Sequence, residues 1–161
     1  MSTTPALQVP LTVRDLELDD VADLEWSGSQ AHMTTIATSI ARAFDGETRM
    51  LGVARPGGML IACGGLDLTR HPGQGFLWML SVHQAWQSLG VGTVLITALE
   101  DAARAENLDQ VGLTVEHDNP RAVALYRRLG YEGHHSVLDE WPSAGGRTYV
   151  TTCLHLVKPM S

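Results

Sequence analysis

The sequence predicts one mixed α/β domain in which antiparallel strands precede a strand that runs into a helix. Residues 50–55 and 59–68 are predicted as strands joined by the turn Pro56-Gly57-Gly58. A further apolar strand at 76–82 is followed, after a glycine-bearing turn, by apolar residues at helical spacing from Val91. Antiparallel strands followed by a strand that feeds a helix predict a mixed, mostly antiparallel sheet with flanking helices.

The remaining elements follow from the same signals, and the length fits one domain over residues 11–158. The first part of the chain is predicted to hold a poorly ordered arm at 1–10, a strand at 11–14, a helix capped by Asp19 or Asp20, and a helix from about His32 to Phe44. A loop is predicted at 69–75, and the long helix that starts at Val91 is predicted to end near Asn107. The last part is predicted to hold a strand at 110–115, a helix that begins at Pro120 and is capped by Gly130, and strands at 131–137 and 148–157 on either side of a turn-rich segment at 139–147. The sheet is expected to hold about seven strands.

Composition and charge narrow the function classes. The 161 residues carry a net charge of −7, with ten arginines, one lysine and no basic cluster. A nucleic-acid partner needs clustered cations to displace counterions, so that class is disfavoured. No apolar run approaches the roughly 20 residues that a membrane-spanning helix needs, and residues 1–10 lack the apolar core of a secretory signal. We therefore expect a cytoplasmic protein with no nucleic-acid or membrane partner.

Two smaller features concern the cysteines and the acidic residues. Cys63 and Cys153 lie in apolar runs without metal-ligand spacing, so buried reduced thiols and no metal site are expected. Six acidic residues and no basic residue lie between Asp15 and Glu25. A solvated helix face is one interpretation of this segment, and an electric field that favours a cationic, amine-bearing substrate is the other.

The turn after the strand at 76–82 is the strongest candidate for a binding site. It contains Gln87-Ser88-Leu89-Gly90-Val91-Gly92-Thr93, in which two glycines let main-chain N–H groups approach a ligand closely. The first N–H groups of a helix have no partner within it, so the turn predicts an anion site, most plausibly for phosphate; simple turn chemistry is the alternative. Thr93 excludes a P-loop, which needs Lys there, and Leu95 excludes a dinucleotide-binding turn, which needs a third glycine.

The same residues resemble the acetyl-CoA-binding signature of the GNAT superfamily of N-acetyltransferases, Gln/Arg-x-x-Gly-x-Gly/Ala. The segment 115–131, with Asn119, Leu125-Tyr126 and Gly130-Tyr131, resembles the second cofactor segment of that superfamily. The two motifs stand in the same order as in the superfamily and together span residues 76–131, about a third of the chain.

The resemblance implies a sheet whose central strand pair is splayed, with pantetheine in the gap, and acetyl-CoA as cosubstrate. The turn would hold the pyrophosphate, main-chain groups of Leu80 and Val82 would pair with pantetheine, and Tyr126 would protonate the coenzyme A thiolate. Core packing for Tyr126 and helix capping for Asn119 are the alternatives. The expected cofactor-binding residues are Leu80, Val82, Gln87, Ser88, Leu89, Gly90, Val91, Gly92, Thr93, Asn119 and Tyr126.

The acceptor end is less determined. In the superfamily the connection between the first two helices lines the acceptor site, which makes Trp26, His32 and Met33 candidates, with core packing as the alternative. Trp78 is added because it lies on the strand that feeds the turn. An amine is mostly protonated at neutral pH, so a carboxylate, a histidine or a water chain must take up its proton. Glu116 is the first candidate for that base, followed by His117 and Asp67, and each could instead be a surface residue. Trp26, His32, Trp78 and Glu116 are expected to border one cleft.

The function expected from these features is direct transfer of acetyl from acetyl-CoA to a primary amine in a ternary complex, with Tyr126 and Glu116 as the catalytic residues. A non-catalytic acyl-CoA-binding or sensing module would keep the glycine turn without needing Tyr126. Within the enzyme class, a small molecule and a protein N-terminus or lysine both remain open as acceptor, as does assembly into a homodimer.

Overall fold

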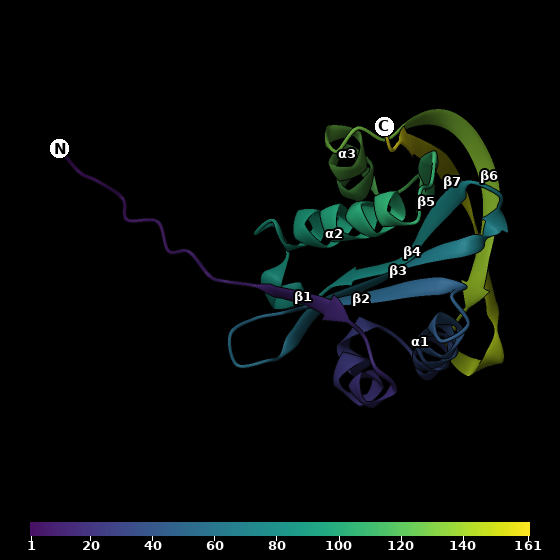
Figure 1. Cartoon of the computed structure of the whole chain (residues 1–161), viewed down its shortest axis with the longest axis horizontal. Coiled ribbons are helices and arrows are strands. Elements are labelled where there is room, and N and C mark those ends of the chain that lie inside the picture. Colours follow the sequence, from purple (N-terminus) through teal and green to yellow (C-terminus); the bar gives the residue numbers. More distant parts are fainter.

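The computed structural model describes all residues, 1–161, and contains the predicted mixture of strands and helices (Figure 1). In chain order the elements are β1 (Thr12–Asp15), the 3₁₀ helix η1 (Leu18–Ser27), α1 (Gln30–Ala43), β2 (Thr48–Ala54), β3 (Leu60–His71), β4 (Gln74–Val82), the 3₁₀ turn η2 (Gln84–Trp86), α2 (Val91–Ala105), β5 (Gln110–Glu116), α3 (Pro120–Arg128), β6 (Glu132–Pro142), the 3₁₀ turn η3 (Ala144–Gly146) and β7 (Thr148–Pro159).

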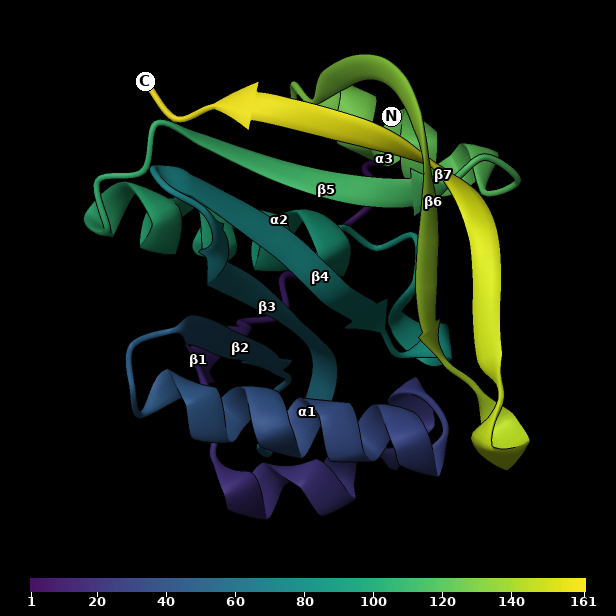
Figure 2. The same cartoon turned by 90° about the vertical axis from the view of Figure 1, so that its right-hand side faces the viewer.

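The seven strands form one sheet in the order β1-β2-β3-β4-β5-β7-β6, and only the β4–β5 pair is parallel. The predicted fold class is therefore confirmed. Helices α2 and α3 cover one face of the sheet, while η1 and α1 cover the other (Figure 1). The long β6–β7 hairpin curls past the end of β5 until its tip, η3, contacts α1 (Figure 2).

The parallel pair is splayed, as expected. Strands β4 and β5 pair only at Gln74–Gln110, Gly75–Val111 and Phe76–Gly112, and then diverge. The cause is a bulge in β4: the register with β3 shifts between Cys63–Ser81 and Gly65–Trp78, so β4 holds one extra residue there. Met79, within this bulge, has a φ of 55°. A bulge bends the strand that carries it, which here turns β4 away from β5 and leaves both inner edges unpaired.

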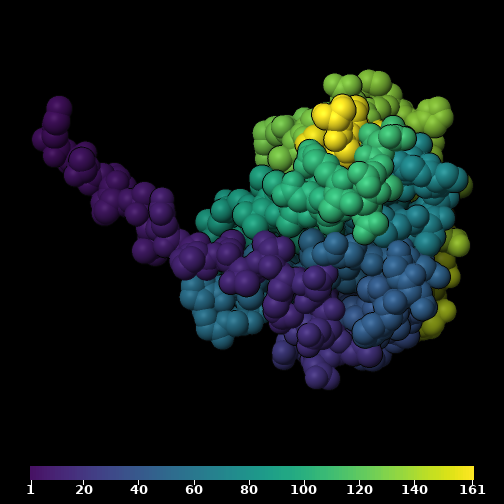
Figure 3. All heavy atoms as spheres, viewed as in Figure 1, coloured from purple at the N-terminus to yellow at the C-terminus, as the bar shows by residue number.

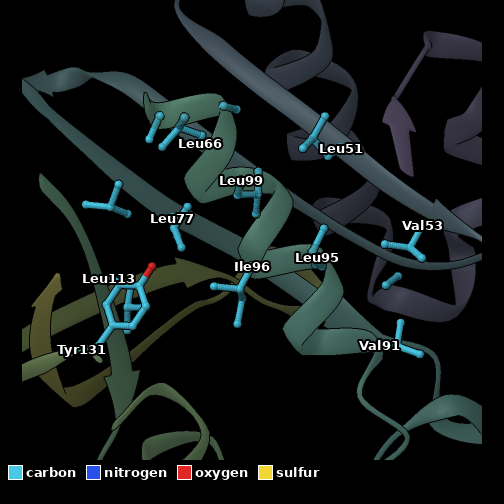
Figure 4. Packing of buried hydrophobic residues seen from close by; sticks show 14 of the residues in the cluster. Leu51, Val53, Leu66, Leu77, Val91, Leu95, Ile96, Leu99, Leu113 and Tyr131 are labelled. Atoms are coloured by element: carbon cyan, nitrogen blue, oxygen red, sulfur yellow. The ribbon is translucent and has the colours of Figure 1, made fainter. Parts of the chain in front are cut away.

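Two hydrophobic clusters hold the helices on the sheet. The larger one lies under α2, where Val91, Leu95 and Leu99 recur every four residues and so share one helix face (Figure 4). They pack against strand residues such as Leu66 and Leu77, all nearly inaccessible to solvent. The smaller cluster lies under α1 and η1 and contains Met33, Ile36 and Ile40. The two clusters fix both helical layers around the splayed pair.

Two predicted loops are largely strand, and the reason in both cases is cross-strand pairing. The loop expected at 69–75 shrinks to Pro72-Gly73, because β3 continues to His71, which pairs with Gln74. Gly73 has a φ of 73°, which suits a tight hairpin. The turn-rich segment expected at 139–147 belongs to β6 as far as Pro142, paired with β7. Pairing with a neighbouring strand overrides local turn propensity at both places.

The helix ends agree with most, but not all, of the predicted caps. The first helix is a 3₁₀ helix capped by Glu17, and the Asp20 carboxylate accepts the Glu17 N–H at 2.7 Å from inside the first turn. The second helix begins two residues earlier than predicted, after Ser29. Asn107 is left-handed, with φ of 57°, as predicted. Pro120 opens α3 and Gly130, with φ of 96°, follows it, also as predicted.

Residues 1–10 contain no helix or strand and extend away from the body of the molecule (Figure 3). None of the helices has the length and apolar character needed to cross a bilayer. Both cysteines, Cys63 and Cys153, are buried free thiols, as predicted.

Candidate active site

The loop between β4 and α2 presents a row of free main-chain donors. The N–H groups from Ser88 to Thr93 have no acceptor within the protein, and the first helical bond runs from the Val94 N–H to the Gly90 carbonyl at 3.2 Å. Ser88, with φ of 66°, and Gly90, with φ of 89°, are left-handed, which turns the chain into the helix. Free N–H groups at a helix N-terminus, where the helix dipole favours negative charge, form an anion site.

Space for a ligand lies directly in front of these donors. A Cβ atom added to Gly90 would meet nothing within 4 Å, and one added to Gly92 would come no closer than 3.6 Å to Leu125 and 3.8 Å to Val82. The two glycines therefore leave open the volume that side chains would otherwise occupy. A pyrophosphate group fits this arrangement of donors and space.

Gln87 and the β4 edge extend the site from the loop into the splayed gap. The Gln87 side-chain amide donates to the Val82 carbonyl at 3.1 Å, so it braces the loop against β4. The His83 N–H donates to Ile61 on β3 at 2.7 Å. Main-chain groups alternate along an antiparallel strand, so we expect those of Val82 and Leu80 to face away from β3 and toward the gap.

A cavity of about 730 Å³ occupies the gap, bounded by β4, β5, the start of α1 and the β6–β7 hairpin. It brings together six of the predicted site residues: His32, Trp78, Leu80, Glu116, Asn119 and Tyr126. The cavity is lined by four successive residues of β5: the half-buried Thr114 and Glu116 and, alternating with them, the buried Leu113 and Val115.

Two of the predicted acceptor residues lie elsewhere. Trp26 lines a neighbouring cavity together with Leu80 and Gln87, and its ring packs on His83 with the centroids 5.3 Å apart. Met33 is 5% exposed and belongs to the hydrophobic cluster under α1. The reason is its position on the helix, since Met33 shares the sheet-facing side of α1 with Ile36. Met33 is therefore a core residue.

His32 lines the large cavity from the start of α1. It follows Ser29, whose hydroxyl accepts the His32 N–H at 3.3 Å and caps α1. Its imidazole packs under Gly28, where a Cβ would come within 2.7 Å of the ring. Burial lowers the pKa of His32, which favours the neutral imidazole, and its Nε2 atom is buried without a hydrogen-bond partner.

Tyr126 lines the cavity. Its ring packs edge-on against Tyr131, with the centroids 6.1 Å apart, and its hydroxyl makes no hydrogen bond within the protein. Burial raises the pKa of Tyr126 to about 12, so the phenol is protonated at neutral pH. Tyr131 is fixed by a hydrogen bond, because its hydroxyl donates to the buried Glu100 carboxylate at 2.8 Å. The Lys158 Nζ donates to both oxygens of this carboxylate at 3.0 Å.

Asn119 has the capping role that the sequence left open as an alternative. Its Oδ1 accepts the Ala122 N–H at 3.2 Å, which fixes the start of α3. Because Asn119 also lines the cavity, its side-chain NH₂ is available to a ligand.

Of the three candidate bases, only Glu116 lies in the cavity. Its Oε2 accepts the Tyr149 hydroxyl at 3.1 Å and the Thr151 hydroxyl at 3.4 Å. Asp67 is buried, accepts two hydrogen bonds from Thr69 and lies 3.6 Å from two arginines, so it is structural. The Nε2 of His117 lies 3.0 Å from the Ser136 hydroxyl on the molecular surface.

Three charged residues of the cavity were not anticipated: Arg70, Asp139 and Glu140. They come from segments predicted as loops, so their strand-like alternation was not considered. Asp139 is fixed over β5, because the Thr114 hydroxyl donates to its Oδ2 at 2.6 Å. The acidic segment between Asp15 and Glu25 contributes none of its carboxylates to the cavity. No group of three or more His, Cys, Asp or Glu side chains is arranged to hold a metal ion.

Comparison with known proteins agrees with this geometry. Residues 14–131 match the acetyltransferase (GNAT) family. Mycothiol acetyltransferase of Clavibacter michiganensis subsp. michiganensis is 41% identical over 59 residues, which cover 37% of this chain and 19% of that protein. YxbD of Bacillus subtilis (strain 168) is 34% identical over 53 residues, 33% of each chain. The matched stretch thus spans no more than a third of either curated relative.

Two solved structures show the same fold over nearly the full length. The ribosomal-protein-S18-alanine N-acetyltransferase from Escherichia coli has a TM-score of 0.75 at 20% identity, covering 94% of this chain and 95% of that one. The PaiA N-acetyltransferase from Thermoplasma acidophilum, solved in complex with coenzyme A, has a TM-score of 0.69 at 14% identity, covering 93% and 99%. Since the family match spans most of the chain, from β1 to Tyr131, this protein belongs to the GNAT family of acetyltransferases and is an acyltransferase.

Proposed function

We propose that the protein transfers an acetyl group from acetyl-CoA to the primary amine of a small molecule, with both substrates bound together. One observation carries the proposal: β4 and β5 diverge between the free donors at the start of α2 and a cavity that contains Tyr126 and Glu116. A smaller cavity, lined by Val82 and Gln87 on the loop side, shares Leu80 with the larger one. Acetyl-CoA is the acetyl donor of this family, and one structural neighbour was solved with coenzyme A.

The chain's own groups suit the two halves of the cosubstrate. The N–H groups from Ser88 to Thr93 would bind the pyrophosphate, and the gap-facing main-chain groups of Leu80 and Val82 would pair with the pantetheine amides. When bound, acetyl-CoA supplies an acetyl group activated as a thioester. The open gap between β4 and β5 gives that arm a route from the loop to the cavity.

The proposed reaction needs two proton transfers, one from the acceptor ammonium and one to the departing thiolate, and the cavity offers a side chain for each. An amine with a pKa near 10 is mostly protonated at pH 7, which sets it about three pKa units, or roughly 4 kcal/mol, from its nucleophilic form. The Glu116 carboxylate would take the proton from the acceptor ammonium. The Tyr126 hydroxyl, protonated because burial raises its pKa to about 12, would donate a proton to the departing thiolate.

Charge and shape support a small acceptor that carries an ammonium group. Glu116, Asp139 and Glu140 line the cavity, so negative groups outnumber its single arginine. Such a lining favours an ammonium group over an anion. The tip of the β6–β7 hairpin contacts α1 (Figure 2), and residues 141–144 of this tip line the cavity. A cavity bordered by the hairpin on that side favours a small molecule over a chain terminus of a folded protein.

A panel of acceptors tests this proposal. Thiol release from acetyl-CoA is measured with small primary amines and, in parallel, with short peptides that carry a free N-terminus or a lysine. We expect release to depend on a small amine. A preference for peptides would move the acceptor to proteins, and no release with any acceptor would refute the proposed transfer.

A further inference from the structure

Arg70 is the one basic residue that lines the cavity, and its surroundings orient it. Its guanidinium lies over the Phe76 ring, with the central carbon 3.7 Å from the ring centroid. This stacking holds the guanidinium plane while leaving its N–H edge open. Phe76 pairs with Gly112 in the last rung before β4 and β5 diverge, so Arg70 marks the closed end of the gap.

The N–H groups of Arg70 make no hydrogen bond within the protein. Its Nε forms an ion pair with the Asp67 carboxylate at 3.6 Å, which is longer than a hydrogen bond. That carboxylate already accepts the N–H and hydroxyl of Thr69 and faces Arg42 at 3.6 Å. Arg42, in contrast, donates to Glu47 at 2.8 Å and to Thr69 at 3.0 Å. Of these two neighbouring arginines, only Arg70 both lines the cavity and keeps its N–H groups out of hydrogen bonds.

Positive and negative side chains lie at different levels along β5, with Arg70 at one end and Asp139 and Glu116 toward the other. Gly112 lies level with Phe76 and Arg70, Thr114 holds Asp139, and Glu116 follows at the end of the strand. Residues on one face of a strand advance by roughly 7 Å per pair, so Arg70 and Glu116 belong to levels about 13 Å apart along β5. A ligand that spans the cavity meets a cation at one end and carboxylates at the other.

We propose that Arg70 binds an anionic group of the acceptor, so that the acceptor is an amino carboxylate. Its carboxylate lies against the guanidinium of Arg70 and its ammonium is directed toward Glu116. Because these levels are well separated, the fitting compound carries its amine and carboxylate several bonds apart, as in an ω-amino carboxylate, and not on one carbon. This inference rests on the proposed transfer to an amine and names the acceptor class.

The test compares ω-amino carboxylates of increasing length with alkylamines of matching length, in wild type and in Arg70→Gln. We expect wild type to prefer the longer carboxylates. Arg70→Gln should lower kcat/KM for them about tenfold, through KM, because a charge-assisted hydrogen bond to a partly exposed arginine is lost. Its kcat/KM for the alkylamines should not fall. Arg70→Lys should recover part of the loss, since the positive charge remains.

Arg104→Gln is the matched control, because Arg104 is 44% exposed, as against 42% for Arg70, and pairs with Asp101 on the outer side of α2. It should change neither acceptor class. Calorimetry adds a readout without turnover: an N-acetylated ω-amino carboxylate should bind wild type more tightly than Arg70→Gln. Equal losses for amines and carboxylates, or equal binding of this ligand, would overturn the role of Arg70 while leaving acetyl transfer intact. No thiol release with any acceptor would overturn both.

Discussion

Replacing Tyr126 with Phe removes one oxygen from the cavity wall and tests whether that hydroxyl moves a proton. The ring packs edge-on against Tyr131, and the hydroxyl makes no hydrogen bond within the protein, so the variant keeps its packing and loses only a donor. We therefore expect the free energy of unfolding and the affinity for acetyl-CoA to change by no more than about 0.5 kcal/mol.

Whether the Tyr126 hydroxyl can protonate a thiolate depends on the pKa values of a phenol and a thiol in this cavity. Burial raises the pKa of Tyr126 to about 12, and burial together with nearby carboxylates raises that of the Cys153 thiol to about 11. The same two causes, burial and nearby carboxylates, would raise the pKa of a cofactor thiol bound in this cavity and so bring it closer to that of the Tyr126 phenol. Against a solvated thiol of pKa about 8.5, proton transfer from Tyr126 would be uphill by roughly 5 kcal/mol.

Proton donation from Tyr126 is therefore feasible, and its loss should lower the rate about 10²- to 10⁴-fold. The assay is single-turnover acetyl transfer from pH 6 to 9, with wild type and Tyr126→Phe at equal cofactor occupancy. Because Tyr126 is protonated throughout this range, the ratio of the two rates should not vary with pH. Equal rates for the two proteins would refute the argument and return Tyr126 to a packing role.

Three further predictions concern binding and stability. Gly92→Glu should abolish acetyl-CoA binding by calorimetry, because its side chain fills the phosphate site and repels the anion, whereas Thr97→Glu, on the exposed face of the same helix, should not. Lys158→Met should lower the free energy of unfolding in urea by about 3 kcal/mol, since it leaves the Glu100 carboxylate, with a 6% exposed side chain, without its cation. An undiminished unfolding energy would contradict this. The hydrogen bond from an arginine lowers the pKa of Asp20, so wild type should lose stability as pH falls below the ordinary value of 3.8, and Asp20→Asn should lose less over that range in urea titrations.

The features that the sequence predicts well are those encoded locally. Gly90 and Gly92 predict the turn, and the apolar residues that recur every four positions from Val91 predict the helix that follows it. The register of β3 against β4 is not local. No glycine or other turn residue at Met79 predicts the bulge in β4, yet this bulge opens the gap between β4 and β5.

The acceptor end depends on contacts between distant segments, and for this reason it was predicted only in part. Asp139 reaches Thr114 because the β6–β7 hairpin curls over β5, which no local pattern of residues records. Met33 looked like a pocket residue because of its place after the first helix, but the orientation of α1 buries it. Arg70 lies in a segment that the sequence predicts as a loop, and this segment is a strand because His71 pairs with Gln74.

The central claim is that an amine in the cavity accepts acetyl from acetyl-CoA held at the start of α2. The most direct measurement is the ratio of acetylated amine, by mass spectrometry, to thiol released from acetyl-CoA by the purified wild-type protein. We predict equal amounts of the two products and no thiol release when the amine is left out. Thiol release that is independent of the amine, or the absence of any acetylated product, would contradict the claim.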